Sequence, residues 1–260
     1  MNAPDPAPLE QIPLPDAGPP QGRQSWIRSA GSAWSTAARD LLLVSLDGVV
    51  RLHGRTAETV VVPGLAATVP AGERFRTQAH HGARIWWLWA APPDTTASGL
   101  GSFFESPILS AAARSPSAWS TSGSVSQHLA SALRGLVPTW IAATPPVLLP
   151  RPADPRLRTA LDWLSERLER PVGLPDAART AGLAERTFQR RCRSDLGLSL
   201  TAWLTRARML RAIAHLADSD MPIAGVALRC GYQSPAAFTR AFTSLIGTTP
   251  SAWRTQDRTI

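Results

Sequence analysis

Apolar residues recur at helical spacing through the C-terminal part of the chain and predict two helices there. The first is a leading helix that stops before Pro171, and the second is a long helix from about 199 to 217. Their apolar positions are Leu157, Ala160, Leu161, Leu164 and Leu168 in the first, and Leu200, Trp203, Leu204, Ala207, Leu210, Ile213 and Leu216 in the second. The long helix is apolar enough to join its neighbours rigidly.

The segments on either side of the long helix share one pattern of residues, written twice between 174 and 254. Seven positions recur at an offset of fifty: Phe188, Arg190, Cys192, Leu196, Gly197, Ala202 and Trp203 correspond to Phe238, Arg240, Phe242, Ile246, Gly247, Ala252 and Trp253. Four earlier positions recur at an offset of forty-nine: Ala177, Ala178, Ala181 and Gly182 correspond to Val226, Ala227, Cys230 and Gly231. The change of offset falls in the turn between two helices.

Each copy of this pattern predicts a helix-turn-helix motif, in which small residues let two crossing helices approach closely. The first copy has a short helix over 175–181, a turn at Gly182-Leu183 and a second helix over 184–196. The second copy has a short helix over 223–229, capped by Ser219 or Asp220, and a turn at Gly231. Its second helix starts at Pro235 after a Ser234 cap, ends at Gly247, and faces the core with Phe238, Phe242 and Leu245.

Short β-prone runs separated by turns characterise the region from about 35 to 92, which predicts a small all-β barrel or sandwich. We expect residues 41–46 and 49–53 to form a hairpin around Asp47-Gly48, and 59–62 and 85–89 to be further strands. The tryptophans on the last strand, Trp86, Trp87 and Trp89, are interpreted as core residues, with an apolar ligand pocket as the alternative.

Four segments follow from these patterns. Residues 1–24 hold seven prolines and no apolar periodicity, and they predict a disordered tail. The β region and a following amphipathic helix make a domain over 25–143, and a proline-rich linker covers 144–155. The helix is predicted from Val125, Leu129, Ala132, Leu133, Leu136 and Val137, with Ser124 or Ser126 near its start. This helix either covers the barrel or packs against the same helix of a second subunit in a homodimer. The double helix-turn-helix domain covers 156–255.

The distribution of charge along the chain indicates the kind of partner that the protein binds. At 260 residues and 44% hydrophobic composition, the chain has room for two domains. Its net charge of +8 is uneven, because residues 1–150 carry ten Arg and nine acids, whereas residues 151–260 carry seventeen Arg and ten acids. A C-terminal excess of +7 indicates a polyanionic partner, with nucleic acid as the first candidate and an anionic membrane surface as the second.

Location follows from what the sequence lacks. The longest apolar run, residues 85–91, is far shorter than the roughly 20 residues that span a bilayer. The N-terminus resembles neither a signal nor a transit peptide, and two cysteines make no disulfide framework. We expect a cytoplasmic protein with no membrane partner.

The segment 223–254 resembles the C-terminal signature of the AraC/XylS family of bacterial transcription regulators, and the match extends over roughly 155–254. The residues that carry it are Ala227, Gly231, Tyr232, Ser234, Phe238, Arg240, Ala241, Phe242, Gly247, Pro250, Trp253 and Arg254. The resemblance implies an α+β multidomain protein that binds double-stranded DNA with two recognition helices in successive major-groove segments. The β region resembles the cupin-like sensor domain of many bacterial regulators through residues 69–75.

Outward positions on the two recognition helices are the candidates for contacting DNA. On the first helix they are Arg186, Gln189, Arg190 and Arg193, and in the family the positions that match the first three contact the major groove. On the second they are Gln233, Ser234, Thr239 and Arg240, interrupted by Pro235 and Ala236, whose side chains offer no polar contact. We therefore expect the first helix to carry most of the specificity, and Thr239 and Arg240 to contribute in part through phosphates.

A regulator of this kind is expected to be a homodimer, to respond to a small-molecule effector through its N-terminal domain and, if it activates, to contact RNA polymerase. The alternative is a cupin-type metal enzyme with an appended helical interaction domain. That alternative requires a cluster of ligands, but Phe75 stands where a histidine ligand is expected, and His80 and His81 are strand neighbours that point to opposite faces. We predict no catalytic residues, no metal and no cofactor. Cys192 and Cys230 are interpreted as apolar core residues rather than redox sensors.

Overall fold

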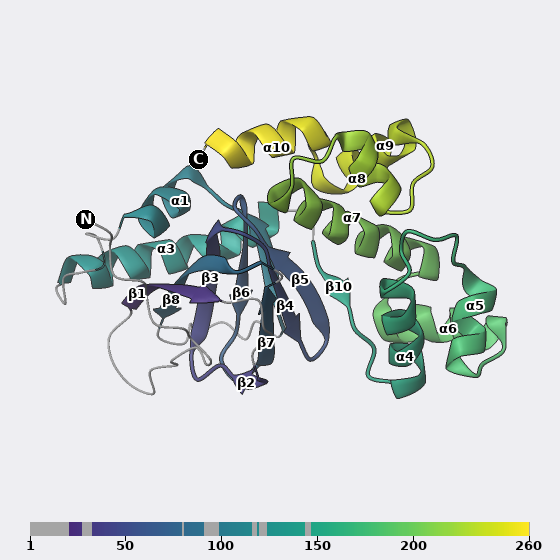
Figure 1. The fold of residues 1–260 in the computed structure, drawn as a ribbon. Helices are drawn as coiled ribbons and strands as arrows, with labels where there is room; N and C mark the ends of the chain where they lie inside the picture. The colour runs from purple at the N-terminus through teal and green to yellow at the C-terminus, as the bar shows by residue number, and fades with distance from the viewer. Residues whose placement is uncertain are drawn as a thin grey trace. The chain divides into compact units, whose positions relative to one another are not determined.

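The computed structural model describes residues 21–27, 33–79, 81–90, 99–115, 119, 124–143 and 147–259, which fall into two compact units (Figure 1). The N-terminal unit comprises Met1–Arg55, Thr59–Pro146 and Thr259–Ile260, and the C-terminal unit comprises Thr56–Glu58 and Val147–Arg258. Most of the predicted tail, 1–24, lies outside the described residues. Its last four residues belong to a strand that begins at Gln21, so that part of the prediction is wrong.

Two five-stranded antiparallel sheets contain the described strands. The first sheet has the order β1 (Gln21–Ile27), β8 (Ala83–Ala90), β3 (Asp40–Asp47), β6 (Leu65–Val69) and β9 (Gly101–Phe104). The second sheet has the order β10 (Leu149–Pro150), β5 (Ala57–Val61), β4 (Val50–Gly54), β7 (Arg74–Ala79) and β2 (Ser35–Thr36). The α+β class is confirmed. Of the predicted barrel or sandwich, the described strands form two separate antiparallel sheets and no closed barrel.

The predicted hairpin between residues 41–46 and 49–53 is wrong, because the two strands belong to different sheets. β3 pairs with β6 and β8, whereas β4 pairs with β7. The Asp47-Gly48 turn carries the chain from one sheet to the other, and the Ser45 hydroxyl donates to the Gly48 carbonyl at 2.8 Å. Every side chain from Leu41 to Leu46 is buried, so β3 is covered on both faces and cannot be an ordinary half-exposed hairpin strand.

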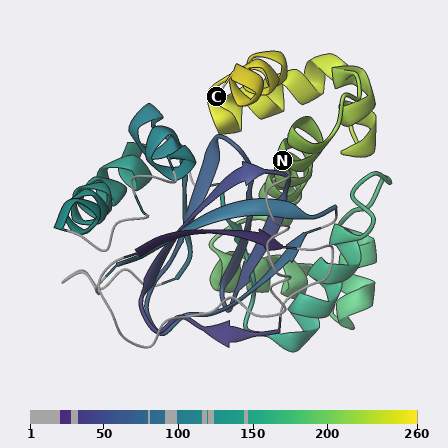
Figure 2. The same cartoon turned by 60° about the vertical axis from the view of Figure 1, so that its left-hand side comes forward.

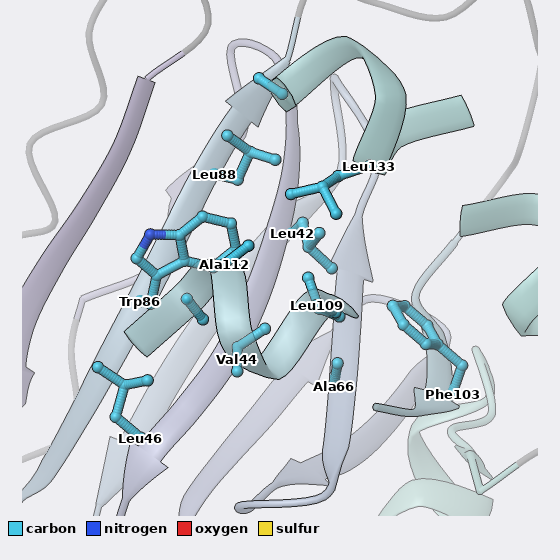
Figure 3. Packing of buried hydrophobic residues seen from close by; sticks show 12 residues of the cluster. Leu42, Val44, Leu46, Ala66, Trp86, Leu88, Phe103, Leu109, Ala112 and Leu133 are labelled. Carbon is cyan, nitrogen blue, oxygen red and sulfur yellow. The ribbon is translucent and has the colours of Figure 1, made fainter. Parts of the chain in front are cut away.

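Two helices cover one face of the first sheet, α1 (Pro107–Arg114) and α3 (Ser124–Ala143) (Figure 2). Alternate residues of β3 and β8 point to this face, where Val44 and Trp86 pack with Leu109 of α1 and Leu133 of α3 (Figure 3). The intervening residues, which include Leu43 and Trp87, are also fully buried and face the opposite way. The predicted core role of Trp86, Trp87 and Trp89 is therefore confirmed.

Helix α3 is longer than predicted, and its buried face agrees with the prediction only in part, since Leu129 and Val137 do pack against the core. Ala130 and Leu133 are buried, whereas Ala132 and Leu136, which we assigned to the apolar face, are exposed. The start at Ser124 agrees with the prediction. Helix α1 was not predicted, although Ser106 before Pro107 is a helix-start signal and caps the Leu109 amide at 3.2 Å.

The turn that carries the cupin resemblance joins β6 to β7. Phe75, which occupies the place expected for a histidine ligand, is fully buried. The His81 side chain is exposed, and His80 lies outside the described residues. The resemblance of this unit to cupin-like sensor domains stays a prediction.

Seven helices are described in the C-terminal unit: α4 (Pro155–Ser165), α5 (Leu174–Ala181), α6 (Glu185–Leu196), α7 (Leu200–Asp218), α8 (Ile223–Arg229), α9 (Pro235–Ile246) and α10 (Pro250–Thr259). Figure 1 shows α7 running between the pair α5–α6 and the pair α8–α9. The first motif is therefore α5, Gly182 and α6, and the second is α8, Gly231 and α9. Residues 147–155, predicted to be linker, contain β10 and the Asp154 cap of α4, and Val147 and Leu149 are buried.

The repeated scaffold positions form the core of each motif. Phe188, Cys192 and Leu196 are buried in α6, and Phe238, Phe242 and Ile246 are buried in α9. Leu245, predicted to face inward, is only half-buried, because Ile246 occupies the inner face. The predicted side-chain cap of α8 by Ser219 or Asp220 is also wrong, since Pro222 stands at that position and has no capping side chain.

Candidate nucleic-acid interface

The exposed face of α6 brings together all four outward residues predicted for the first motif. Arg186, Gln189, Arg190 and Arg193 are exposed, and they lie within two turns of one helix. Three guanidinium groups and one carboxamide supply hydrogen-bond donors and an acceptor on one exposed helix surface. An α-helix with this surface fits the width of a DNA major groove.

Packing of α6 against its neighbouring helices fixes which side of α6 faces solvent. The inner face of α6 lies against α5, whose buried residues Ala177, Ala178 and Ala181 have short side chains and allow close approach of the two helices. Gly182 ends α5 with a φ of 62°, a left-handed conformation that glycine adopts without strain. Arg191, on the flank of α6, forms an ion pair with Asp154 at the start of α4. The recognition helix is thus anchored to its partner helix and to the leading helix.

A polar groove of about 400 Å³ lies beside α6. Gln189 and Arg193 of α6 line it, and the start of α7 forms another wall, where Ser199 caps the Ala202 amide at 3.2 Å. Thr201, Thr205 and Arg208 also line it. Helix starts present amide donors and a partial positive charge, so the groove has the chemistry of a phosphate site next to the exposed face of α6.

Three of these groove residues were missed by reasoning from the sequence. Thr201, Thr205 and Arg208 stand at i, i+4 and i+7, the spacing of one helical face, which could have marked them as a polar stripe on α7. They were overlooked because the apolar stripe of the same helix dominated its interpretation. The Arg208 guanidinium also lies 5.6 Å from the centre of the Tyr232 ring, so this residue contacts the second motif as well.

The second motif presents a poorer polar surface. Gln233, Ser234 and Arg240 are exposed and Thr239 is half-buried, so the predicted residues do lie near the start of α9. The Ser234 hydroxyl accepts from the Ala237 amide at 3.4 Å, which gives this residue a capping role. Pro235 and Ala236 occupy the exposed first turn. Only Arg240 offers a charged side chain among the predicted residues of this helix.

Both cysteines lie behind the recognition helices and are fully buried. Burial, with a smaller contribution from the negative charge of Asp195, raises the pKa of the Cys192 thiol to about 11. Burial also raises the pKa of the Cys230 thiol to about 12. Both thiols are therefore protonated at neutral pH and act as apolar packing groups, as predicted.

Two surveys of the described part of the chain concern other kinds of site. No group of three or more His, Cys, Asp and Glu side chains there is arranged to hold a metal ion. None of the helices in the same ranges has the length and apolar character needed to cross a membrane.

Comparison with known proteins gives a match over the region that holds both motifs. Residues 177–256 match the family model described as a helix-turn-helix domain. The chain is 33% identical over 96 residues to the probable transcription factor PqrA of Proteus vulgaris, which covers 36% of this chain and 79% of that protein. It is 28% identical over 98 residues to the regulatory protein SoxS of Salmonella typhimurium, covering 38% of this chain and 92% of SoxS.

Longer relatives match over the same part only. The chain is 30% identical over 107 residues to the regulatory protein PocR of Salmonella typhimurium, and this stretch is 35% of PocR. The chain therefore spans about a third of that relative.

Among solved structures, the DNA-binding domain of AdpA in complex with a target DNA is 34% identical, with a TM-score of 0.39, over 41% of this chain and 96% of that one. ToxT of Vibrio cholerae O395 is 10% identical, with a TM-score of 0.42, over 93% of this chain and 99% of ToxT.

The family follows from the two motifs joined by a long helix, from the repeated core positions, and from the similarity to these transcription regulators. The match to PqrA supports this assignment most strongly, because it has 33% identity and covers 79% of that protein. The chain belongs to the AraC/XylS family of DNA-binding transcription regulators.

Proposed function

We propose that this protein reads a specific operator chiefly through α6, and that α9 adds a second contact directed mainly at the DNA backbone. Arg186, Gln189 and Arg190 contact base edges in one major-groove segment, with Arg193 at the edge of the same face. Gln233, Ser234, Thr239 and Arg240 approach the next segment, about one helical turn away.

The observation that carries this proposal is the position of the polar groove. Gln189 and Arg193 belong both to the exposed face of α6 and to the lining of the groove. A phosphate in the groove would fix the register of the helix while the neighbouring side chains reach the bases. A structural role alone does not account for three arginines and a glutamine on one solvent-facing surface.

The test is operator affinity of the Arg190→Ala variant. If Arg190 makes a bidentate contact to guanine, removing it weakens binding by about 1–3 kcal/mol and relaxes preference at one base position. Arg156→Ala is the matched control, because Arg156 is also exposed but lies in the first turn of α4. Equal losses for the two variants would mean that charge alone matters, and the assignment of α6 would then be wrong.

We also propose that the N-terminal unit modulates DNA binding, through a small effector, self-association or both. Apolar side chains exposed on its helices, Leu136 at 38% and Ile108 at 60%, support an interaction surface. Sedimentation of the Leu136→Glu variant tests the dimer. Ser131→Glu is the control, because Ser131 is also exposed on α3 but lies on another side of the helix. We expect the Leu136 variant alone to shift to monomer.

The effector, or the position of the operator, then determines whether RNA polymerase is recruited or blocked.

A further inference from the structure

A cavity of about 360 Å³ opens in the N-terminal unit between the C-terminal half of α3 and the first sheet. Leu41, Thr68 and Leu88 line it from the sheet, and Arg134, Val137 and Ile141 line it from the helix. These three helix residues stand at i, i+3 and i+7, so one face of α3 forms the roof. The volume lies within the range of pockets that bind small molecules, and it is too small to accept a helix of another protein.

The way α3 is held explains why a cavity lies beneath it. The helix is seated on the sheet at Leu133, which is buried. It approaches the sheet closely again at its end, where a Cβ on Gly101 would lie 3.1 Å from the Ile141 side chain. Between these two points stands Pro138, which has no amide hydrogen and interrupts the helical hydrogen bonds. The cavity is thus bounded at both ends by fixed contacts rather than being a loose gap at a mobile edge.

The walls define the chemistry of an occupant. They are mainly apolar, with one acidic and one basic side chain, Asp40 and Arg134, so their charges cancel. The Asp40 carboxylate accepts the Ala71 amide at 2.8 Å and has capacity for a further donor. Burial raises the pKa of Asp40, although the Ala71 amide and the Arg134 guanidinium act against this rise. A partly buried carboxylate near an arginine favours a neutral ligand with a hydrogen-bond donor over a second charged group.

We propose that this cavity binds one uncharged, mainly apolar small molecule that directs a hydrogen-bond donor to Asp40. Its role as an effector rests on the proposed function, whereas its binding does not. Because one face of α3 is the roof and Leu136 lies on the same helix, occupancy stiffens the helix that we propose to pair two subunits.

The experiment is a fluorescence titration of the full-length protein with N-phenyl-1-naphthylamine, an apolar uncharged probe that carries one N–H donor. We expect saturable binding of one probe per chain. The related anion 1-anilinonaphthalene-8-sulfonate carries an added negative charge. We expect it to bind at least about tenfold more weakly, because Asp40 already balances the charge of Arg134 and the mainly apolar wall offers no further cation to pair with the sulfonate. Equal or tighter binding of the anion would overturn the proposed ligand class.

Substitutions at two alanines of α3, one inside the cavity and one outside it, test where the probe binds. Ala142 lines the cavity and Ala132 does not, and both are exposed. We expect Ala142→Phe to weaken binding at least about tenfold and Ala132→Phe to leave it unchanged. Val137→Phe fills the same space from within and gives a second variant, and circular dichroism checks that each is folded. Unchanged binding in both cavity variants would place the probe elsewhere and overturn the proposal.

Two further outcomes keep the explanations apart. If the probe is expelled as the protein concentration rises and the protein self-associates, a second copy covers the cavity and the small-molecule assignment is wrong. DNA affinity is measured in parallel on the same samples. Loss of probe binding with intact operator binding would refute the cavity alone, whereas probe binding without operator binding would refute the proposed function alone.

Discussion

Cys192 and Cys230 illustrate how position decides chemistry for a single side chain. Burial disfavours the thiolate, and it raises the pKa from 9.0 to about 11 for Cys192 and to about 12 for Cys230. A shift of two units leaves roughly a hundredfold less thiolate at a given pH. We therefore predict that native protein reacts with a thiol reagent at pH 8 at least about a hundred times more slowly than urea-unfolded protein. Rapid labelling of the native protein would contradict the buried assignment.

Asp154 links charge to stability at the start of the C-terminal unit. The pKa of Asp154 is lowered from 3.8, first by the hydrogen bond from the Arg156 amide; burial opposes this effect, and the charge and hydrogen bond of Arg191 lower the pKa further. A carboxyl whose pKa is lower in the folded state stabilises the fold above its unfolded pKa, and this contribution is lost as the pH falls through the folded value. We predict that Asp154→Asn lowers the melting temperature at pH 7, with a difference that shrinks below about pH 4.

Asparagine caps helices nearly as well as aspartate, so this substitution removes the charge and keeps the cap. Arg191→Gln should reproduce part of the same pH-dependent difference, because it removes the ion-pair partner of Asp154. A difference that is independent of pH would show that the charge of Asp154 does not stabilise the fold.

The two turn glycines differ in what surrounds them, although the repeat makes them equivalent in sequence. Gly182 has a φ of 62° with open space around its missing Cβ, whereas a Cβ on Gly231, at a φ of 78°, would collide with the Leu168 carbonyl oxygen. Left-handed backbone costs a non-glycine residue roughly 1–2 kcal/mol. We predict that Gly182→Ala destabilises the protein by about that amount in urea unfolding, and that Gly231→Ala destabilises it more. Equal effects would mean that the Leu168 segment moves away at no cost.

Helix α9 combines a structural role with a place near DNA. Replacing Ser234 with Ala removes a cap and should lower the free energy of unfolding by about 1 kcal/mol. Ser234→Asp restores an effective cap but brings a negative charge to the helix start. We predict that the Asp variant is as stable as wild type and binds operator at least about fivefold more weakly. Full operator affinity in the Asp variant would place the start of α9 away from the phosphates.

Periodicity predicted helices α4 to α9 to within a few residues, because each has a stripe of apolar residues, whereas helix α10 was not predicted. Helix α8 illustrates this agreement, since its predicted and observed bounds are both Ile223–Arg229. The strands of the sheets were harder to pair, because β3 is apolar at every position from Leu41 to Leu46 except Ser45, and a nearly continuous apolar run carries no information about which strand it pairs with. Adjacent strands were therefore paired with each other when they belong to separate sheets.

The candidate site was predictable in part for the same reason. Outward residues of α6 follow directly from the inward ones, so Arg186, Gln189, Arg190 and Arg193 emerged from the sequence and their exposure agrees. The groove beside them requires α5, α6 and α7 to meet in space. The cavity under α3 likewise depends on residues of three strands and one helix that are far apart along the chain. Patterns within a short stretch of sequence carry no information about which distant residues come together in the fold.

At the scale of the whole molecule, the unequal distribution of charge agrees with a division of labour between the units. Residues 151–260 hold seventeen of the arginines and the two recognition helices, whereas residues 1–150 are nearly neutral. The chemistry of DNA attraction is therefore concentrated in the unit that carries the motifs. The N-terminal unit contributes a nearly neutral fold with an apolar cavity and an exposed apolar helix face, features of a sensing or pairing module.

The central claim is that one scaffold is used twice, with sequence specificity concentrated in its first copy. Selection of bound sequences from random DNA tests it most directly, with full-length wild type, Arg190→Ala and Arg240→Ala at one salt concentration. The account predicts two contacted segments about 10 base pairs apart, loss of preference at one position of one segment for Arg190→Ala, and a nearly uniform weakening for Arg240→Ala. An unchanged motif for Arg190→Ala, or a lost base preference for Arg240→Ala alone, would contradict it.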